Sequence, residues 1–61
     1  MPKYTIRTNA TEEKTIRAHG FREAASKYHE EVGDMPQNWN GELHVRSEDG
    51  EERTFRRREA A

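Results

Sequence analysis

Apolar and polar residues alternate with a period of two in four short segments of the chain. These segments are Lys3 to Thr8, Glu13 to His19, Glu42 to Ser47 and Glu51 to Arg58. Successive side chains of a β-strand point to opposite faces, so this alternation is typical of strands with one buried face. The sequence therefore predicts four half-buried strands.

Between the second and third segments, the apolar residues take the period of an α-helix. Those at positions i, i+3, i+4, i+7 and i+11 are Phe21, Ala24, Ala25, Tyr28 and Val32. This spacing places them along one stripe of a helix. Gly20 fits the N-cap, and Gly33 fits the left-handed residue that follows the last turn. The pattern predicts a helix that runs to about Val32.

Short connections join the strands in two hairpins. Residues 9–12 form a polar turn between the first two strands, and Asp49-Gly50 is a common hairpin signal between the last two. The helix has to bury its stripe against one face of the sheet, and the simplest all-antiparallel sheet then has the strand order 2-1-3-4. We therefore predict a two-layer α+β fold, β-β-α-β-β, with one helix on a four-stranded antiparallel sheet.

The whole chain of 61 residues makes one small domain, and residues 59–61 are expected to fray. Because only 30% of the residues are hydrophobic, the core is small. Its expected members are Tyr4, Ile6, Ile16, Phe21, Tyr28, Val32, Trp39, Leu43, Val45 and Phe55. A homodimer that shares this core is compatible with such a size.

The chain has no cysteine, which excludes a disulfide framework. It has no apolar run that approaches the roughly 18 residues of a membrane span, and no recognisable export signal. We therefore expect a soluble, intracellular protein of the cytoplasm that does not associate with a membrane.

The formal net charge of −1 argues against a protein that coats nucleic acid without specificity. The strand pattern nevertheless separates the charges, because the side chains that alternate with the core positions are mostly basic. These candidate binding residues are Lys3, Arg7, Arg17, His44, Arg46, Arg56 and Arg58, with Thr5, Thr15 and Thr54 between them. The sequence predicts a basic open face on the sheet.

Two arginines of the last strand, Arg53 and Arg57, fall on the apolar phase. Their alkyl stems can cover the rim of the core while their charged ends reach outward. Negative charge is unfavourable at the C-terminal end of a helix. We predict that these arginines reach Glu30 or Glu31 and offset that charge.

Trp39 is the large aromatic residue of the loop at residues 34–41. It either closes the end of the core between helix and sheet or serves as an exposed stacking anchor for a ligand. We favour the first interpretation and keep Trp39 among the candidate binding residues.

Neither a catalytic motif nor a metal or cofactor motif is recognisable. His29-Glu30 lacks the second histidine of a zinc-binding HExxH motif, and His19 and His44 fall on different strands. We therefore expect no enzyme and no cofactor. The expected function is that of a small interaction or accessory module, which binds a protein or an acidic peptide through the open sheet face or the Trp39 loop.

The alternative function is nucleic-acid binding. Arginines on a sheet face can contact phosphates or the edge of guanine, and the residues concerned are Arg7, Arg17, Arg46 and Arg56. The basic face also has a simpler interpretation, in which it is solvated and its cations pair across strands with Glu13, Glu42 and Glu52.

Overall fold

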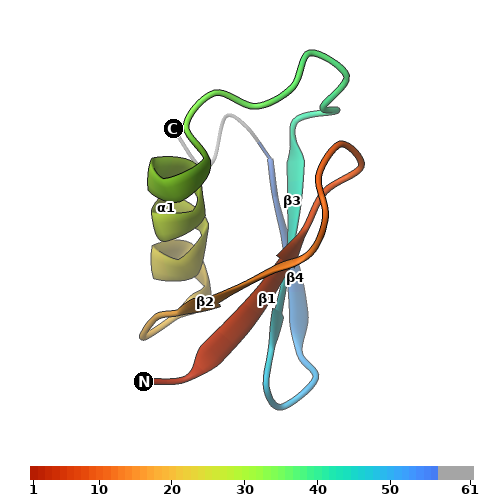
Figure 1. Cartoon of the computed structure of the whole chain (residues 1–61). Helices are drawn as coiled ribbons and strands as arrows, with labels where there is room; N and C mark the ends of the chain where they lie inside the picture. Colours follow the sequence, from red (N-terminus) through yellow and green to blue (C-terminus); the bar gives the residue numbers. More distant parts are fainter. Residues whose placement is uncertain (57–61) are drawn as a thin grey trace.

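The structure, a computed structural model, describes residues 1–56 and contains there one helix and four strands. In chain order the elements are β1 (Lys3–Arg7), β2 (Lys14–Arg17), α1 (Phe21–Val32), β3 (Glu42–Ser47) and β4 (Glu52–Arg56). Neighbouring strands are antiparallel and follow the order β2-β1-β3-β4, with α1 against one face (Figure 1). The predicted two-layer α+β fold and its strand order are confirmed.

Several predictions fall on residues outside the described part of the chain. They are the extension of the last strand to Arg58, the place of Arg58 on the open face, the contact of Arg57 with the helix acids and the frayed end at residues 59–61.

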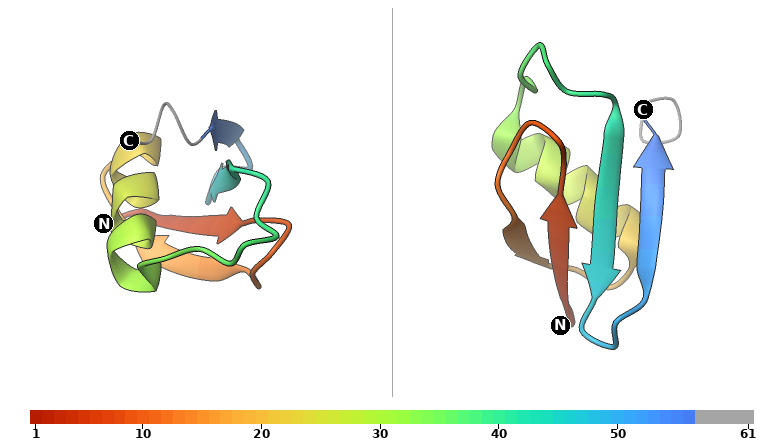
Figure 2. Two further views of the ribbon diagram at one scale, coloured as in Figure 1. Left: turned by 90° about the horizontal axis from the view of Figure 1, so that it is seen from above. Right: turned by 90° about the vertical axis from the view of Figure 1, so that its right-hand side faces the viewer.

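The core lies between α1 and the sheet, as the alternation predicts. Leu43 and Val45 are completely buried, and the other buried apolar residues are Tyr4, Ile6, Ile16, Ala18, Ala24, Ala25 and Tyr28. Phe21, Val32, Met35, Trp39 and Phe55 pack around this cluster and remain partly exposed. The helix packs on β1, β2 and β3, and β4 lies furthest from it (Figure 2).

Glycines flank the helix at both ends. Gly20 has an extended backbone, and its carbonyl accepts the N–H of Ala24 at 3.0 Å. After the last turn, the N–H of Gly33 donates to the carbonyl of His29 at 2.9 Å. Gly33 has a positive φ of 73°, as predicted, but its ψ of −127° lies far from the left-handed helical value of about +47°. This conformation strongly favours glycine.

The loop after β1 is fixed by a chain of hydroxyl groups. Thr8 is buried, and its Oγ1 accepts the N–H groups of Ala10 and Thr11 at 3.2 and 2.9 Å. The Thr11 hydroxyl lies 2.7 Å from that of Thr8 and 2.7 Å from that of Tyr28. The loop therefore supplies a hydrogen-bond partner for the hydroxyl of Tyr28, a buried residue of the helix.

The contact predicted for Arg53 is wrong. Its guanidinium lies 5.1 Å from the centre of the Phe21 ring, at the start of α1. Lys14 supplies the cation near the other end of the helix, since its Nζ lies 3.8 Å from an oxygen of Glu31. Lys14 pairs with Ile6 and so shares the helix side of the sheet. The position of each residue along its strand, which alternation alone does not give, decides which acid it reaches.

The β3–β4 hairpin turns through Ser47 and Gly50. The carbonyl of Ser47 accepts the N–H of Gly50 at 3.1 Å. The N–H of Ser47 donates to the carbonyl of Glu51 at 2.8 Å. Gly50 has a φ of 93°, whereas no other kind of residue within 1–56 has a positive φ. A two-residue type I′ turn needs two consecutive positive φ values. The Asp-Gly pair therefore marks the hairpin, but the turn is longer than that type.

Candidate functional site

One face of the sheet carries the helix, and the other is free of it. We call this second face the open face. Strand alternation and register direct to it the side chains of Lys3, Thr5, Arg7, Thr15, Arg17, Glu42, His44, Arg46, Glu52, Thr54 and Arg56. All candidate binding residues from the strands, other than Arg58, therefore lie together as predicted.

The register arranges these residues in rows that cross the strands. One row places Lys3 opposite Arg17, and the next contains Thr15, Thr5, Arg46 and Glu52. The third row contains Arg7, His44 and Thr54, and the fourth pairs Glu42 with Arg56. Side chains that are direct neighbours in a row are close enough to interact.

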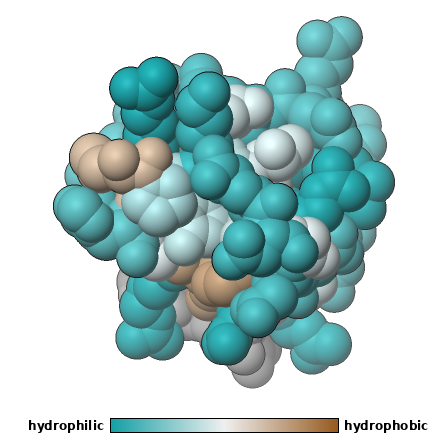
Figure 3. All heavy atoms as spheres, turned by 90° about the horizontal axis from the view of Figure 1, so that it is seen from below, coloured by the Kyte–Doolittle hydropathy of each residue, from teal (hydrophilic) through white to brown (hydrophobic). Residues whose placement is uncertain are grey.

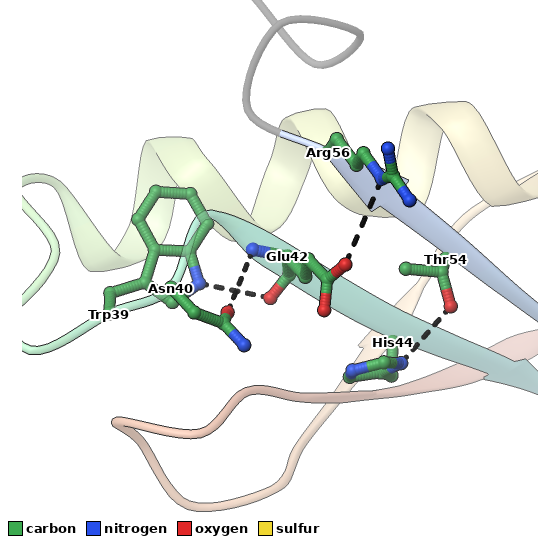
Figure 4. A network of polar contacts seen from close by, with 6 residues as sticks. All are labelled: Trp39, Asn40, Glu42, His44, Thr54 and Arg56. Atoms are coloured by element: carbon green, nitrogen blue, oxygen red, sulfur yellow. Dashed lines mark hydrogen bonds and ion pairs between the residues drawn. The ribbon is translucent and has the colours of Figure 1, made fainter.

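The half of the open face on β3 and β4 has internal polar contacts (Figure 4). Arg56 Nε lies 3.8 Å from an oxygen of Glu42, and His44 Nδ1 lies 3.1 Å from the Thr54 hydroxyl. Glu52 stands opposite Arg46, although no ion pair shorter than 4.0 Å joins them. The predicted cross-strand pairing of charges is therefore found at Glu42.

The remaining cations of the open face differ, because within residues 1–56 no ion pair shorter than 4.0 Å joins them to an acidic side chain. Within residues 1–56, none of the ion pairs includes Lys3, Arg7, Arg17 or Arg46. We call these four residues the cationic cluster. Lys3 and Arg17 are direct cross-strand neighbours, and like charges in that position repel each other. An anion bound between them would reduce this repulsion.

Trp39 faces the helix rather than the open face. Its indole N–H donates to the carbonyl of Glu42 at 2.9 Å (Figure 4), and its ring centre lies 5.9 Å from that of His29. The loop backbone is held by Asn9, whose amide nitrogen donates to the Asn38 carbonyl at 2.8 Å and whose oxygen accepts the Asn40 N–H at 3.0 Å. The favoured interpretation, in which Trp39 closes the core, agrees with this geometry.

A shallow hollow between the start of α1 and β4 was not predicted. Phe21, Arg22, Arg53 and Phe55 contribute to its lining. Phe21 also packs edge to face on Tyr4, with 5.1 Å between the ring centres. The placement of Arg53 on the apolar phase of its strand is the sequence feature that indicates this site.

The described residues contain neither a metal-binding cluster nor a helix that could span a membrane. In the described residues, no group of three or more histidine, cysteine or acidic side chains is placed to hold a metal ion. The helix at residues 21–32 is also too short and too polar to cross a bilayer.

Comparison with models of known families, with curated proteins and with solved structures finds no match for this chain.

Proposed function

We propose that the protein is a non-catalytic binding module, and that the cationic cluster on its open face binds an acidic segment of a partner protein. The observation that carries this proposal is the register of Lys3 opposite Arg17, in a cluster that has no acidic partner within residues 1–56. A carboxylate placed between the two cations gains attraction from both. It also reduces the repulsion between them.

The spacing of the cluster suits an extended peptide. Lys3 and Arg7 lie on the same face of β1 and are four residues apart, which corresponds to roughly 13 Å. Arg46 stands opposite Thr5, halfway between them. In an extended peptide, side chains on one side recur at roughly 7 Å. Three acidic residues at alternate positions would therefore meet the Lys3–Arg17 pair, Arg46 and Arg7 in turn.

Two features of the open face favour a protein over a nucleic acid. Glu42 and Glu52 share this face and would repel the parts of a long phosphate backbone that extend past the cationic cluster, whereas a short acidic segment can stay within it. The described part of the open face also carries no phenylalanine, tyrosine or tryptophan, and its one aromatic ring is that of His44, whereas sheets that recognise RNA stack two or three bases on aromatic residues. The open face therefore suits a short acidic segment of a protein better than a nucleic acid.

A titration tests the proposal. A fluorescein-labelled peptide with glutamates at alternate positions is added to the protein, and anisotropy is followed at low and moderate salt. Arg17→Glu should weaken binding about tenfold, because an exposed ion pair contributes up to about 1 kcal/mol and the new carboxylate adds repulsion. Arg22→Glu, the same change on the exposed part of the helix, should leave the affinity unchanged.

Two results would contradict the proposal. One is the absence of peptide binding at low salt, and the other is an equal loss of affinity in both variants. A duplex oligonucleotide is titrated in parallel. Tighter binding to the duplex than to the peptide, with a steep dependence on salt, would favour the nucleic-acid alternative.

A further inference from the structure

The backbone groups at the outer edge of β4 can be assigned from the hairpin. Ser47 N–H donates to the carbonyl of Glu51 at 2.8 Å, so these two residues form a hydrogen-bonded pair. Bonded and non-bonded pairs alternate along an antiparallel ladder. Arg53 and Phe55, which face Val45 and Leu43, therefore belong to bonded pairs and direct their N–H and C=O groups to β3.

The residues between them direct their backbone groups the other way. The N–H and C=O groups of Glu52 and Thr54 point away from β3, to an edge where the described residues supply no further strand. The opposite edge of the sheet is different, because on β2 the carbonyl of Arg17 accepts a hydrogen bond from Lys27 Nζ at 3.0 Å. The β4 edge is thus the better template for an added strand.

We propose that two copies of the chain form a homodimer by antiparallel pairing of their β4 strands about Thr54. A two-fold axis perpendicular to the sheet makes the same strand in both copies run antiparallel. Residues that direct their backbone groups outward must face each other. The register that pairs all five residues of β4 sets Thr54 opposite the partner's Thr54 and Glu52 opposite the partner's Arg56.

Charge complementarity supports this register. On the open face, the row that crosses the interface reads Arg46, Glu52, the partner's Arg56 and the partner's Glu42. Its signs alternate across the two copies, and the two-fold axis generates the same row a second time. The existing contact between Arg56 and Glu42 is kept, with a second carboxylate added on the other side of the guanidinium.

The helix side of the interface supplies apolar contact. The same register sets Phe55 opposite the partner's Arg53, whose guanidinium already lies over the Phe21 ring. Phe21 and Phe55 are both partly exposed, and a second copy would cover part of this surface. Figure 3 shows that the underside of the molecule is mostly hydrophilic, with small separate areas of apolar surface. Both helices then lie on one side of an eight-stranded sheet, and the two open faces join.

Sedimentation equilibrium of the full chain over a wide concentration range tests the dimer. A five-residue strand pair is a small interface, so the association should be weak and visible at high protein concentration. The apparent mass should rise from 7.2 kDa toward twice that value. A monomer mass at every concentration up to the millimolar range would overturn the proposal.

Two charge reversals test the register. Glu52→Arg sets arginine opposite the partner's Arg56, and Arg56→Glu sets glutamate opposite the partner's Glu52, so each variant alone should dimerise at least about tenfold more weakly. In an equimolar mixture of the two variants, both pairs have opposite charges again. The mixture should therefore dimerise within about threefold of the native protein.

The controls separate this register from a general effect of charge. Glu30→Arg makes the same charge change on the exposed side of the helix and should leave dimerisation unchanged. Thr54→Pro removes an outward N–H that β3 does not use, so the fold should persist and the dimer should be lost. Circular dichroism confirms folding of each variant. A mixture that stays monomeric, or an equal loss in Glu30→Arg, would overturn the register.

Discussion

The two ends of the core between α1 and the sheet are closed in different ways. At the C-terminal end of the helix, Trp39 packs on His29 and donates to a backbone carbonyl, while Asn9 holds the loop with two hydrogen bonds. We call this the sealed end. At the start of the helix, which we call the open end, Phe21 and Phe55 remain partly exposed and no comparable hydrogen bonds join them. Hydrogen bonds thus fix the residues that close one end, whereas ring and cation contacts of Phe21 hold the other and leave it accessible.

The largest expected effect separates the two ends. Trp39→Ala should lower the free energy of unfolding by about 3 kcal/mol, because it removes a large packed ring and one hydrogen bond. For a domain of this size, the midpoint of thermal unfolding should fall by roughly 20 to 24 °C. Circular dichroism is the suitable measurement, because the chain has one tryptophan and the variant therefore has no tryptophan fluorescence to follow.

Trp39→Phe serves as the matched control, because it keeps a ring but cannot donate to Glu42. It should cost about 1 kcal/mol. If both variants were as stable as the native protein, the tryptophan would not close the core and its interpretation as an exposed ligand anchor would gain support.

An intermediate effect is expected at Asn9. Asn9→Ala removes both hydrogen bonds to the loop at residues 38–40 and should destabilise the protein by about 1.5 kcal/mol. Asn9→Asp keeps the oxygen that accepts the Asn40 N–H and should lose about half as much. Chemical denaturation measures both changes. Equal stabilities of the native protein and Asn9→Asp would show that the amide nitrogen contributes nothing to the sealed end.

The smallest effect is expected at the open end. Phe55→Ala should cost about 1 kcal/mol in the monomer, because the ring is only partly buried. The measurement belongs at low protein concentration, where self-association does not add to the apparent stability. A loss as large as that of Trp39→Ala would remove the contrast between the two ends.

The alternation along the strands predicted much of this structure. Each side chain's face follows from its position in a strand, so the sequence alone was enough to derive the burial of Leu43 and Val45 and the shared face of the cationic cluster. Which cations of the open face form ion pairs could not be derived in this way. It depends on which residues stand opposite each other, and loop conformation sets that register.

The contacts between the helix and the sheet could not be predicted from the spacing of apolar residues either. Spacing shows which stripe of the helix is buried but not how far the helix is shifted along the sheet, so Lys14 rather than Arg53 meets Glu31. The hydroxyl chain from Thr8 to Tyr28 was missed for a related reason. Threonines in a turn have many local partners, and only the position of the helix selects the phenol.

The strand order has a consequence for how the chain folds. The β1–β2 and β3–β4 pairs each join neighbours in sequence. β1 and β3 also pair directly, with Tyr4 opposite Ser47, but β2 and α1 lie between them in the sequence. Closing so long a stretch costs more chain entropy than forming either hairpin. Assembly of the central seam should therefore limit the folding rate, and substitutions in β1 should slow refolding more than equally destabilising ones in the outer strands.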